Sequence, residues 1–195
     1  PQREANNKNG KKKKIWYTYL FFLSILIVGL SLGKIFMSIG TIGLTVNWVF
    51  EGDFLAKIDR LKKQKYSSLI LSMGYLVHVL WLFNTQNFTY ASKDLLVKLP
   101  LLLIPIIIGT TRKLEAKELR LLFVLFVSGV IISSFGSMLV YWNIIPPKEA
   151  NALNQISLFM SHIRMGLLVA FTSILLLYIT FFHNNSKPVS YTHLR

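Results

Sequence analysis

Five ionisable side chains stand inside or directly beside long apolar runs of this 195-residue sequence. They are His78, Asp94, Lys98, His162 and Arg164. Charged and histidine side chains at membrane depth are costly to desolvate, so they usually face the interior of a helix bundle or a wet cavity. Arginine can hold two phosphate oxygens at once through its planar guanidinium. As a group, these residues suit an anionic, lipid-anchored ligand.

Taken singly, each of these residues also has a structural explanation. Asp94 and Lys98 are four residues apart with the acid first, so on one helix they can pair, which contributes about 0.2–0.5 kcal/mol when exposed. Arg164 can extend its guanidinium group to the lipid phosphates. His78 can hydrogen-bond to a neighbouring helix. The five taken together, rather than any one of them, point to a binding site.

Composition indicates a membrane protein. Apolar residues make up 53% of the sequence, and its 22 Lys and Arg outnumber 8 Asp and Glu. The charges collect in short blocks between apolar runs of roughly 20 residues, the length that crosses a hydrocarbon core as a helix. A soluble domain would spread its charges along the chain. Nucleic-acid binding is not expected either, because nearly every basic block abuts an apolar run.

No enzyme motif or metal site can be recognised in the chain. There is no cysteine, which excludes disulfides and thiolate metal ligands. No phosphate-binding glycine loop, paired-histidine zinc motif or nucleophile elbow occurs. The sequence therefore predicts no cofactor and no metal.

The apolar runs predict an all-α, polytopic membrane protein with about six transmembrane helices. The segments lie at about 15–32, 35–50, 67–83, 95–109, 121–142 and 163–182. Only Gly33 and Lys34 join the first two, which requires a tight helical hairpin. The fourth segment is marginal in length and carries Pro100 and Pro105, which can kink it.

The distribution of basic residues predicts the orientation. Most lysines and arginines fall in the amino-terminal arm and in the second and fourth connections, with the tail on the same side. Because such residues stay on the cytoplasmic side, both termini should be cytoplasmic. The expected organisation is a basic arm (1–14), a six-helix membrane domain (15–182) and a tail (183–195). The five ionisable residues then all lie near the extracytoplasmic face.

Two surface segments have simpler predictions. From Pro146 to Ile163, apolar residues recur at three- and four-residue steps, which predicts a short amphipathic helix on the outer surface. The basic segments NKNGKKKK and DRLKKQKY suit contact with anionic membrane lipids, at about 1 kcal/mol per charge near the surface.

Both ends of the sequence look incomplete. It begins with Pro rather than Met, and the final PVSYTHLR resembles a translated sequencing-adaptor remnant, which we expect to be artefactual.

Several stretches resemble one protein family. These are NWVFEGDFLAKIDRLKKQK, YLVHVLWLFNTQNFTYASKDLLVKLPLLLIPIII and the later SHIRMGLLV. Together they resemble the amino-terminal half of the O-antigen ligase and O-antigen polymerase-like proteins of Bacteroidetes-type bacteria. The resemblance covers roughly residues 20–182, with the motifs in order and at suitable spacing.

The resemblance implies a metal-independent glycosyltransferase of the bacterial inner membrane with about a dozen helices. Such a protein transfers a glycan from a polyprenyl diphosphate carrier to a lipid A-core acceptor at the periplasmic face. The family's catalytic histidine lies in a large periplasmic loop that we expect beyond this chain, so no residue here is assigned a catalytic role. The chain as it stands should be inactive. Lys98 and Arg164, supported by His78, Asp94 and His162, become candidates for contact with the carrier diphosphate.

Other functions stay open at this point. An O-antigen polymerase, whose acceptor is another carrier-linked glycan, cannot be separated from a ligase by this half. A small transporter or channel would use His78 and the Asp94–Lys98 pair as a proton or ion relay, and should spread polar groups through the membrane. A non-catalytic membrane scaffold is the third possibility.

Overall fold

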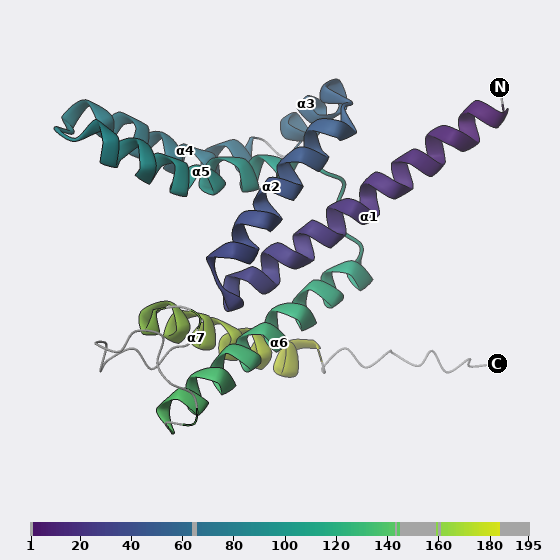
Figure 1. The fold of residues 1–195 in the computed structure, drawn as a ribbon. Helices are drawn as coiled ribbons and strands as arrows, with labels where there is room; N and C mark the ends of the chain where they lie inside the picture. Colours follow the sequence, from purple (N-terminus) through teal and green to yellow (C-terminus); the bar gives the residue numbers. More distant parts are fainter. Residues whose placement is uncertain (1, 64–65, 143, 145–158, 160, 184–195) are drawn as a thin grey trace, which may run out of the picture. The chain divides into compact units, whose positions relative to one another are not determined.

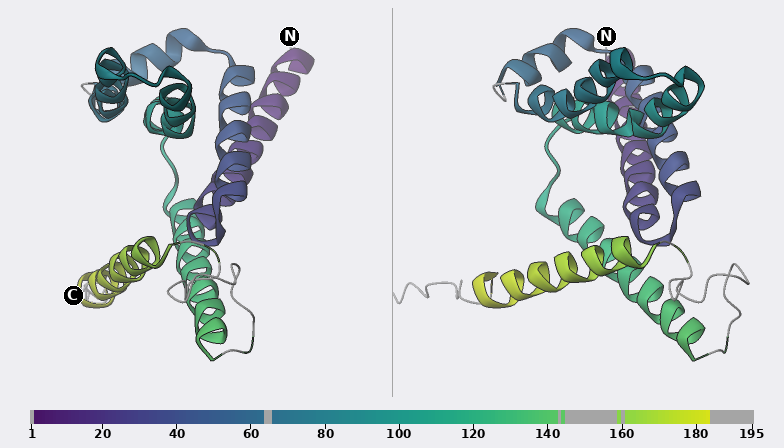
Figure 2. Two further views of the ribbon diagram at one scale, coloured as in Figure 1. Left: turned by 60° about the vertical axis from the view of Figure 1, so that its left-hand side comes forward. Right: turned by 90° about the vertical axis from the view of Figure 1, so that its left-hand side faces the viewer.

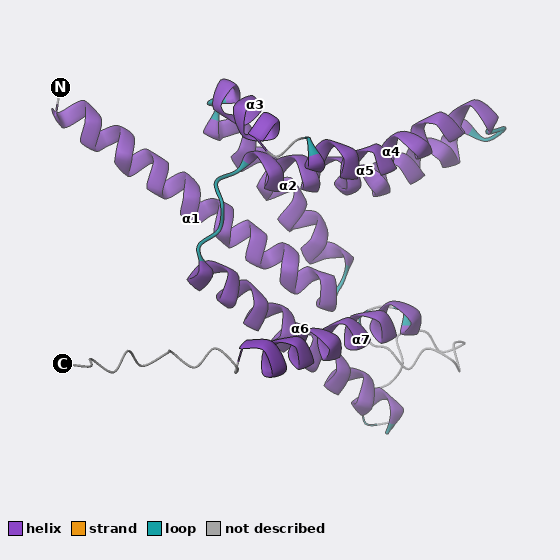
Figure 3. Ribbon diagram, turned by 180° about the vertical axis from the view of Figure 1, so that it is seen from behind, coloured by secondary structure: helices purple, strands orange, loops and turns teal. Residues whose placement is uncertain are grey.

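The computed structural model of the chain describes residues 2–63, 66–142, 144, 159 and 161–183. Within these residues every regular element is helical (Figure 3). The elements are α1 (Gln2–Leu32), α2 (Lys34–Glu51), α3 (Phe54–Lys63), α4 (Ser67–Trp81), the 3-10 turn η1 (Leu82–Asn84), α5 (Phe88–Thr110), α6 (Ala116–Tyr141), α7 (His162–Tyr178) and the π-helical turn η2 (Ile179–His183) (Figure 1). The predicted all-α class is confirmed.

Each of the six predicted segments coincides with a helix, and the described residues include four that are long and apolar enough to cross a membrane. These are 10–32 of α1, 67–84 of α4 and η1, 116–141 of α6 and 163–181 of α7. A fifth span follows if α2 and α3, bent by 111°, are taken together. The chain is thus built as an all-helical, multi-pass membrane protein. Six spans and cytoplasmic termini stay predictions.

α5 is absent from those candidates because of the charges near its start. It has 23 residues, and every stretch of 18 within it contains Lys93, Asp94 and Lys98. The helix is longer than predicted and runs on through Pro100 and Pro105 to Thr110. The two prolines therefore do not end it.

The chain forms two compact units, which are described separately. The first comprises Pro1–Leu30 and Lys34–Phe123, and the second comprises Ser31–Gly33 and Val124–Arg195. Burial is low on most helices, and large apolar side chains on α4 and α7 in particular are exposed. Exposed apolar surface of this extent suits a lipid environment.

The α1–α2 hairpin is as tight as the sequence predicts. Gly33 is the single residue between the two helices, and its φ of 132° is one that side chains with a Cβ rarely adopt. Farther along, a Cβ added to Gly40 would lie 2.7 Å from the Cα of Leu26. The two backbones approach this closely only because residue 40 is glycine, the kind of small-residue contact that membrane helix pairs use.

The core of the first unit joins α1, α2, α5 and α6. Its members are aliphatic or aromatic side chains that are almost fully buried: Tyr19, Leu23, Leu26, Leu44, Ile107 and Leu122. Leu44 and Ile107 are each 1% exposed, so α2 and the end of α5 meet at the centre of this core.

α4 and α5 form a second, antiparallel hairpin and lie side by side in every view (Figures 1 and 2). Two cross-helix hydrogen bonds fix their register. Ser72 Oγ donates to the carbonyl of Leu102 at 3.1 Å, and the Tyr75 hydroxyl donates to the carbonyl of Leu95 at 3.4 Å. This register sets which side chains meet near the tip of the hairpin.

In the second unit, α7 packs against the later part of α6. Phe126 and Phe171 make an edge-to-face contact with ring centroids 6.0 Å apart. Ser133, which is fully buried, donates to Met165 Sδ at 3.5 Å. These contacts pair the two helices in antiparallel register.

One element differs from the sequence prediction, and two predictions fall outside the described residues. Residues 54–63 were expected to be part of a connection, but they form α3. The predicted amphipathic helix lies mostly within 145–158, and nearly all of the tail lies within 184–195, so both predictions concern residues that the structure does not describe.

Candidate functional site

A pocket of about 440 Å³ lies near the tip of the α4–α5 hairpin. Its walls come from the last turns of α4, from η1 and from the first turns of α5. The lining residues are Val77, His78, Trp81, Leu82, Thr85, Tyr90, Ala91, Asp94, Leu95 and Lys98. Three of the five ionisable residues predicted from the sequence thus line one cavity.

Lys98 connects the other two polar groups of this pocket. Its Nζ donates to Asp94 Oδ2 at 2.6 Å and lies 3.3 Å from His78 Nδ1. A lysine ammonium has three donors and no acceptor, so it can donate to Nδ1 in the tautomer of His78 that carries its proton on Nε2. The predicted Asp94–Lys98 ion pair and the predicted contact of His78 with a neighbouring helix are both confirmed.

The pocket is open enough to admit a ligand. The side chains of Asp94 and Lys98 are 38% and 35% exposed, so neither is sealed in the hairpin. Two of the three Lys98 N–H groups are directed to Asp94 and His78, and no other described residue accepts from the third. An acceptor-rich anion is the ligand that such a group binds best.

Local structure at the start of α5 adds a favourable field. The side chain of Asn87 accepts a hydrogen bond from the backbone N–H of Tyr90 at 3.1 Å, as an N-cap does. The pocket therefore lies beside the positive end of the α5 dipole, which favours negative charge within the first turn.

Arg164 and His162 belong to the second unit. Ser161 caps α7, its hydroxyl accepting from the N–H of Arg164 at 3.5 Å, and the Arg164 side chain is exposed. The side chain of His162 lies outside what the structure describes. A shared site of these two residues with the pocket of the first unit stays a prediction.

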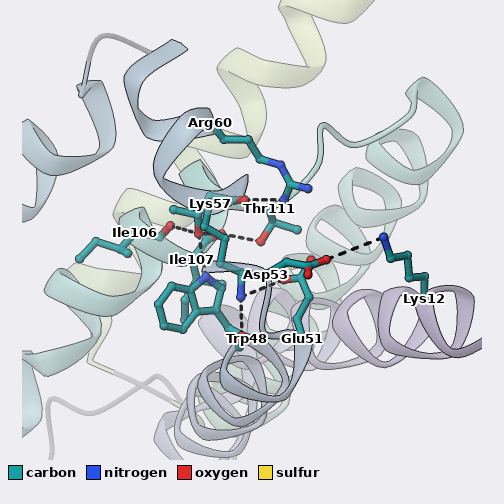
Figure 4. Close-up of polar contacts among 10 residues, drawn as sticks. Lys12, Trp48, Glu51, Asp53, Lys57, Arg60, Ile106, Ile107 and Thr111 are labelled. Carbon is teal, nitrogen blue, oxygen red and sulfur yellow. Dashed lines mark hydrogen bonds and ion pairs between the residues drawn. The ribbon is translucent and has the colours of Figure 1, made fainter. Parts of the chain in front are cut away.

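At the other end of the first unit, a second cluster joins cations to aromatic rings and backbone carbonyls. We call it the basic collar; it consists of Trp16, Trp48, Glu51, Lys57, Arg60, Thr110, Arg112 and Glu118, and Figure 4 shows part of it. From the sequence, the lysines and arginines of these connections are expected only to set the topology and to contact lipid.

Lys57 is the most buried cation of the collar, at 2% exposure. Its Nζ donates to the carbonyl of Trp48 at 2.5 Å, lies 3.2 Å from Glu51 Oε2 and stands 4.3 Å from the centroid of the Trp48 ring (Figure 4). A buried ammonium is tolerated when it is paired and hydrogen-bonded in this way. Lys57 thereby fixes α3 against the end of α2.

Two further contacts join α2 and α3 to the end of α5. Arg60 donates to the carbonyl of Thr110 at 2.7 Å, which satisfies one of the free carbonyls at the helix terminus. Trp48 Nε1 donates to the hydroxyl of Thr110, also at 2.7 Å. These bonds hold the last turn of α5 where the chain leaves for α6.

Arg112 and Trp16 bring α1 into the same collar. The guanidinium carbon lies 3.6 Å from the centroid of the Trp16 ring, and Arg112 also pairs with Glu118 at 3.2 Å. Trp16 Nε1 donates to the same carboxylate at 2.6 Å. The tryptophans at the ends of the apolar runs, a common feature of membrane interfaces, were the one sequence signal for this cluster.

Neither cluster resembles a metal centre. No group of three or more His, Asp or Glu side chains close enough to bind a metal ion occurs in the part of the chain that the structure describes.

Comparison with known proteins does not assign the chain to a family, since no protein family, curated protein or solved structure matches it.

Proposed function

We propose that the pocket of the α4–α5 hairpin binds the diphosphate of a polyprenyl diphosphate-linked glycan. The chain would then serve a glycosyltransferase of the O-antigen ligase type, which passes the glycan to lipid A-core at the outer face of the bacterial inner membrane. An O-antigen polymerase would use the same donor. The main observation in support is the partly exposed Lys98 ammonium, which lines a cavity together with His78.

The position of the pocket within its hairpin is consistent with this proposal. α4 begins and α5 ends toward the basic collar, whereas the pocket lies at the opposite end of both helices. Lysine and arginine clusters favour the cytoplasmic side of a membrane. If the collar follows that rule, the pocket opens on the other face, where polyprenyl-linked glycans would be presented.

Asp94 gives the proposal a specific consequence. Its carboxylate holds Lys98 in place, but it also repels an incoming anion and occupies one of the three ammonium donors. Removing the negative charge while keeping the shape should therefore strengthen diphosphate binding. Removing the charge of Lys98 should weaken it.

The test uses the full chain in nanodiscs, with farnesyl diphosphate as the probe and farnesol as the control without phosphate. We expect Lys98→Gln to weaken binding of the diphosphate at least tenfold and Asp94→Asn to tighten it severalfold, with farnesol binding unchanged. Lys93→Gln is the matched control, because Lys93 is exposed on the same helix but does not line the pocket. Equal binding by the Lys98 and Lys93 variants would refute the proposal.

A second candidate is favoured by one observation, the continuous chain from Asp94 through Lys98 to His78. Such a chain is the kind of structure that relays protons in transporters. In proteoliposomes with a pH-sensitive dye inside, a relay would lose its flux in the Asp94→Asn variant. The same variant should bind diphosphate more tightly under our main proposal, so one substitution separates the two functions.

A further inference from the structure

α3 directs the buried Lys57 and the half-buried Arg60 toward the protein. Its apolar side chains stay largely exposed, although the Phe54 ring makes an edge-to-face contact with Trp48 at 5.7 Å between centroids. Lys57 is 2% exposed, whereas Phe54, Leu55 and Ile58 are 52%, 82% and 47% exposed. These three lie one and four residues apart and so share a face of the helix. A surface helix of a water-soluble protein has the opposite arrangement, with its apolar stripe facing the core.

The orientation of α3 is set by the two residues before its first turn. Gly52 and Asp53 both have positive φ, 65° and 47°, and the helix axis turns by 111° between α2 and α3. The buried contacts of Lys57 with Trp48 and Glu51 hold this turn (Figure 4). If α2 runs close to the membrane normal, α3 runs close to the membrane plane.

The charges around the exposed face identify the surface that would cover it. Lys62 and Lys63 stand exposed at the end of α3, and the ion pair of Lys12 with Asp53, at 3.8 Å, brings the basic turns of α1 to its start. An apolar face bordered by exposed lysines complements a bilayer, whose acyl chains lie just below anionic phosphates. A protein partner would not require an apolar face with lysines at its border.

We propose that α3 is an interfacial helix that binds the headgroup region of an anionic phospholipid leaflet. Phe54, Leu55 and Ile58 lie among the upper acyl segments, and Lys62 and Lys63 contact lipid phosphates. This proposal does not depend on the function of the α4–α5 pocket.

The chain contains no cysteine, so single cysteines can be introduced and spin-labelled without a background. Leu55→Cys probes the exposed apolar face, and Ala56→Cys probes an exposed position on another face of α3. The labelled full chain is reconstituted in vesicles of phosphatidylcholine and phosphatidylglycerol. We expect the label at 55 to be severalfold more accessible to oxygen than to a water-soluble nickel chelate, and the label at 56 to show the reverse.

Two results would overturn the interfacial position. Equal access of nickel to both labels would place α3 in water, and shielding of position 55 from both reagents would mean that a protein surface covers it.

The role of the lysines is tested separately with the double variant Lys62→Gln/Lys63→Gln. Omitting phosphatidylglycerol should raise nickel access to the label at position 55 when both lysines are present, but not in the double variant. The matched control, Lys113→Gln/Lys117→Gln, should respond like the native chain, and a lysine variant that also does so would refute the phosphate contacts.

Discussion

The two ends of the first unit use cations in different ways. In the collar, Lys57 is enclosed by a tryptophan ring, a backbone carbonyl and a carboxylate, and it is 2% exposed. In the pocket, Lys98 has a carboxylate and an imidazole beside it but remains 35% exposed at a cavity wall. A cation that is buried among its partners holds helices together, whereas one that stays partly exposed at a cavity can bind a ligand.

The strongest test of this comparison is Lys57→Met. The substitution removes the charge that compensates Glu51 and leaves the carbonyl of Trp48 without its partner, so we expect a loss of about 3 kcal/mol in the free energy of unfolding. Unfolding in mixed micelles with increasing dodecyl sulfate, followed by tryptophan fluorescence, measures it. Lys62→Met, at an exposed position of the same helix, should change stability by less than about 0.5 kcal/mol. Equal effects of the two would remove the distinction between collar and surface.

A smaller loss is expected for Arg112→Gln. The change removes the cation from the Trp16 face and one partner from Glu118, but the Arg112 side chain is about half exposed, so the loss should be about 1 kcal/mol. The same micelle titration checks it, with Lys113→Gln as the control. A loss of stability as large as that of the Lys57 variant would mean that the exposed fraction of a collar side chain does not determine how much its contacts stabilise the protein.

Lys98→Gln should have the opposite profile to the Lys57 variant. Its pair with Asp94 is an i, i+4 contact about one-third exposed, so the free energy of unfolding should fall by no more than about 0.5 kcal/mol. Diphosphate binding, in contrast, should fall at least tenfold. A Lys98 variant that loses stability like Lys57→Met would place the pocket among the structural contacts and not among the binding sites.

The smallest effect is expected for Lys12→Gln. The Lys12 and Asp53 side chains are 73% and 61% exposed and 3.8 Å apart, a geometry in which solvent screens the pair. We expect no measurable change in the free energy of unfolding at physiological salt. A clear loss would show that the collar extends along α1 beyond Trp16.

The pocket was more predictable from the sequence than the collar because its key contact is local. Asp94 and Lys98 share one helix face through their spacing alone, and His78 required only that the next helix be antiparallel. The bond between Trp16 and Glu118 joins residues 102 positions apart, and no periodicity reveals such a pair. Contacts of this kind follow from tertiary packing, which apolar patterns constrain only loosely.

The helices themselves were predicted well because long apolar runs leave few alternatives. α3 was missed because it contains no long apolar run. Its ten residues carry five charges, so it looks like a solvated connection until the burial of Lys57 is seen. The direction of its exposed apolar side chains depends on the turn at Gly52 and Asp53, which no apolar pattern reveals.

The single-residue link between α1 and α2 also bears on how the protein is made. With only Gly33 between them and glycine at the closest approach of the two helices, there is no chain length to let the first helix settle in the bilayer before the second arrives. α1 and α2 would have to leave the ribosome and insert into the bilayer together as one hairpin. Gly33 would then be needed for membrane insertion as well as for the turn in the folded protein.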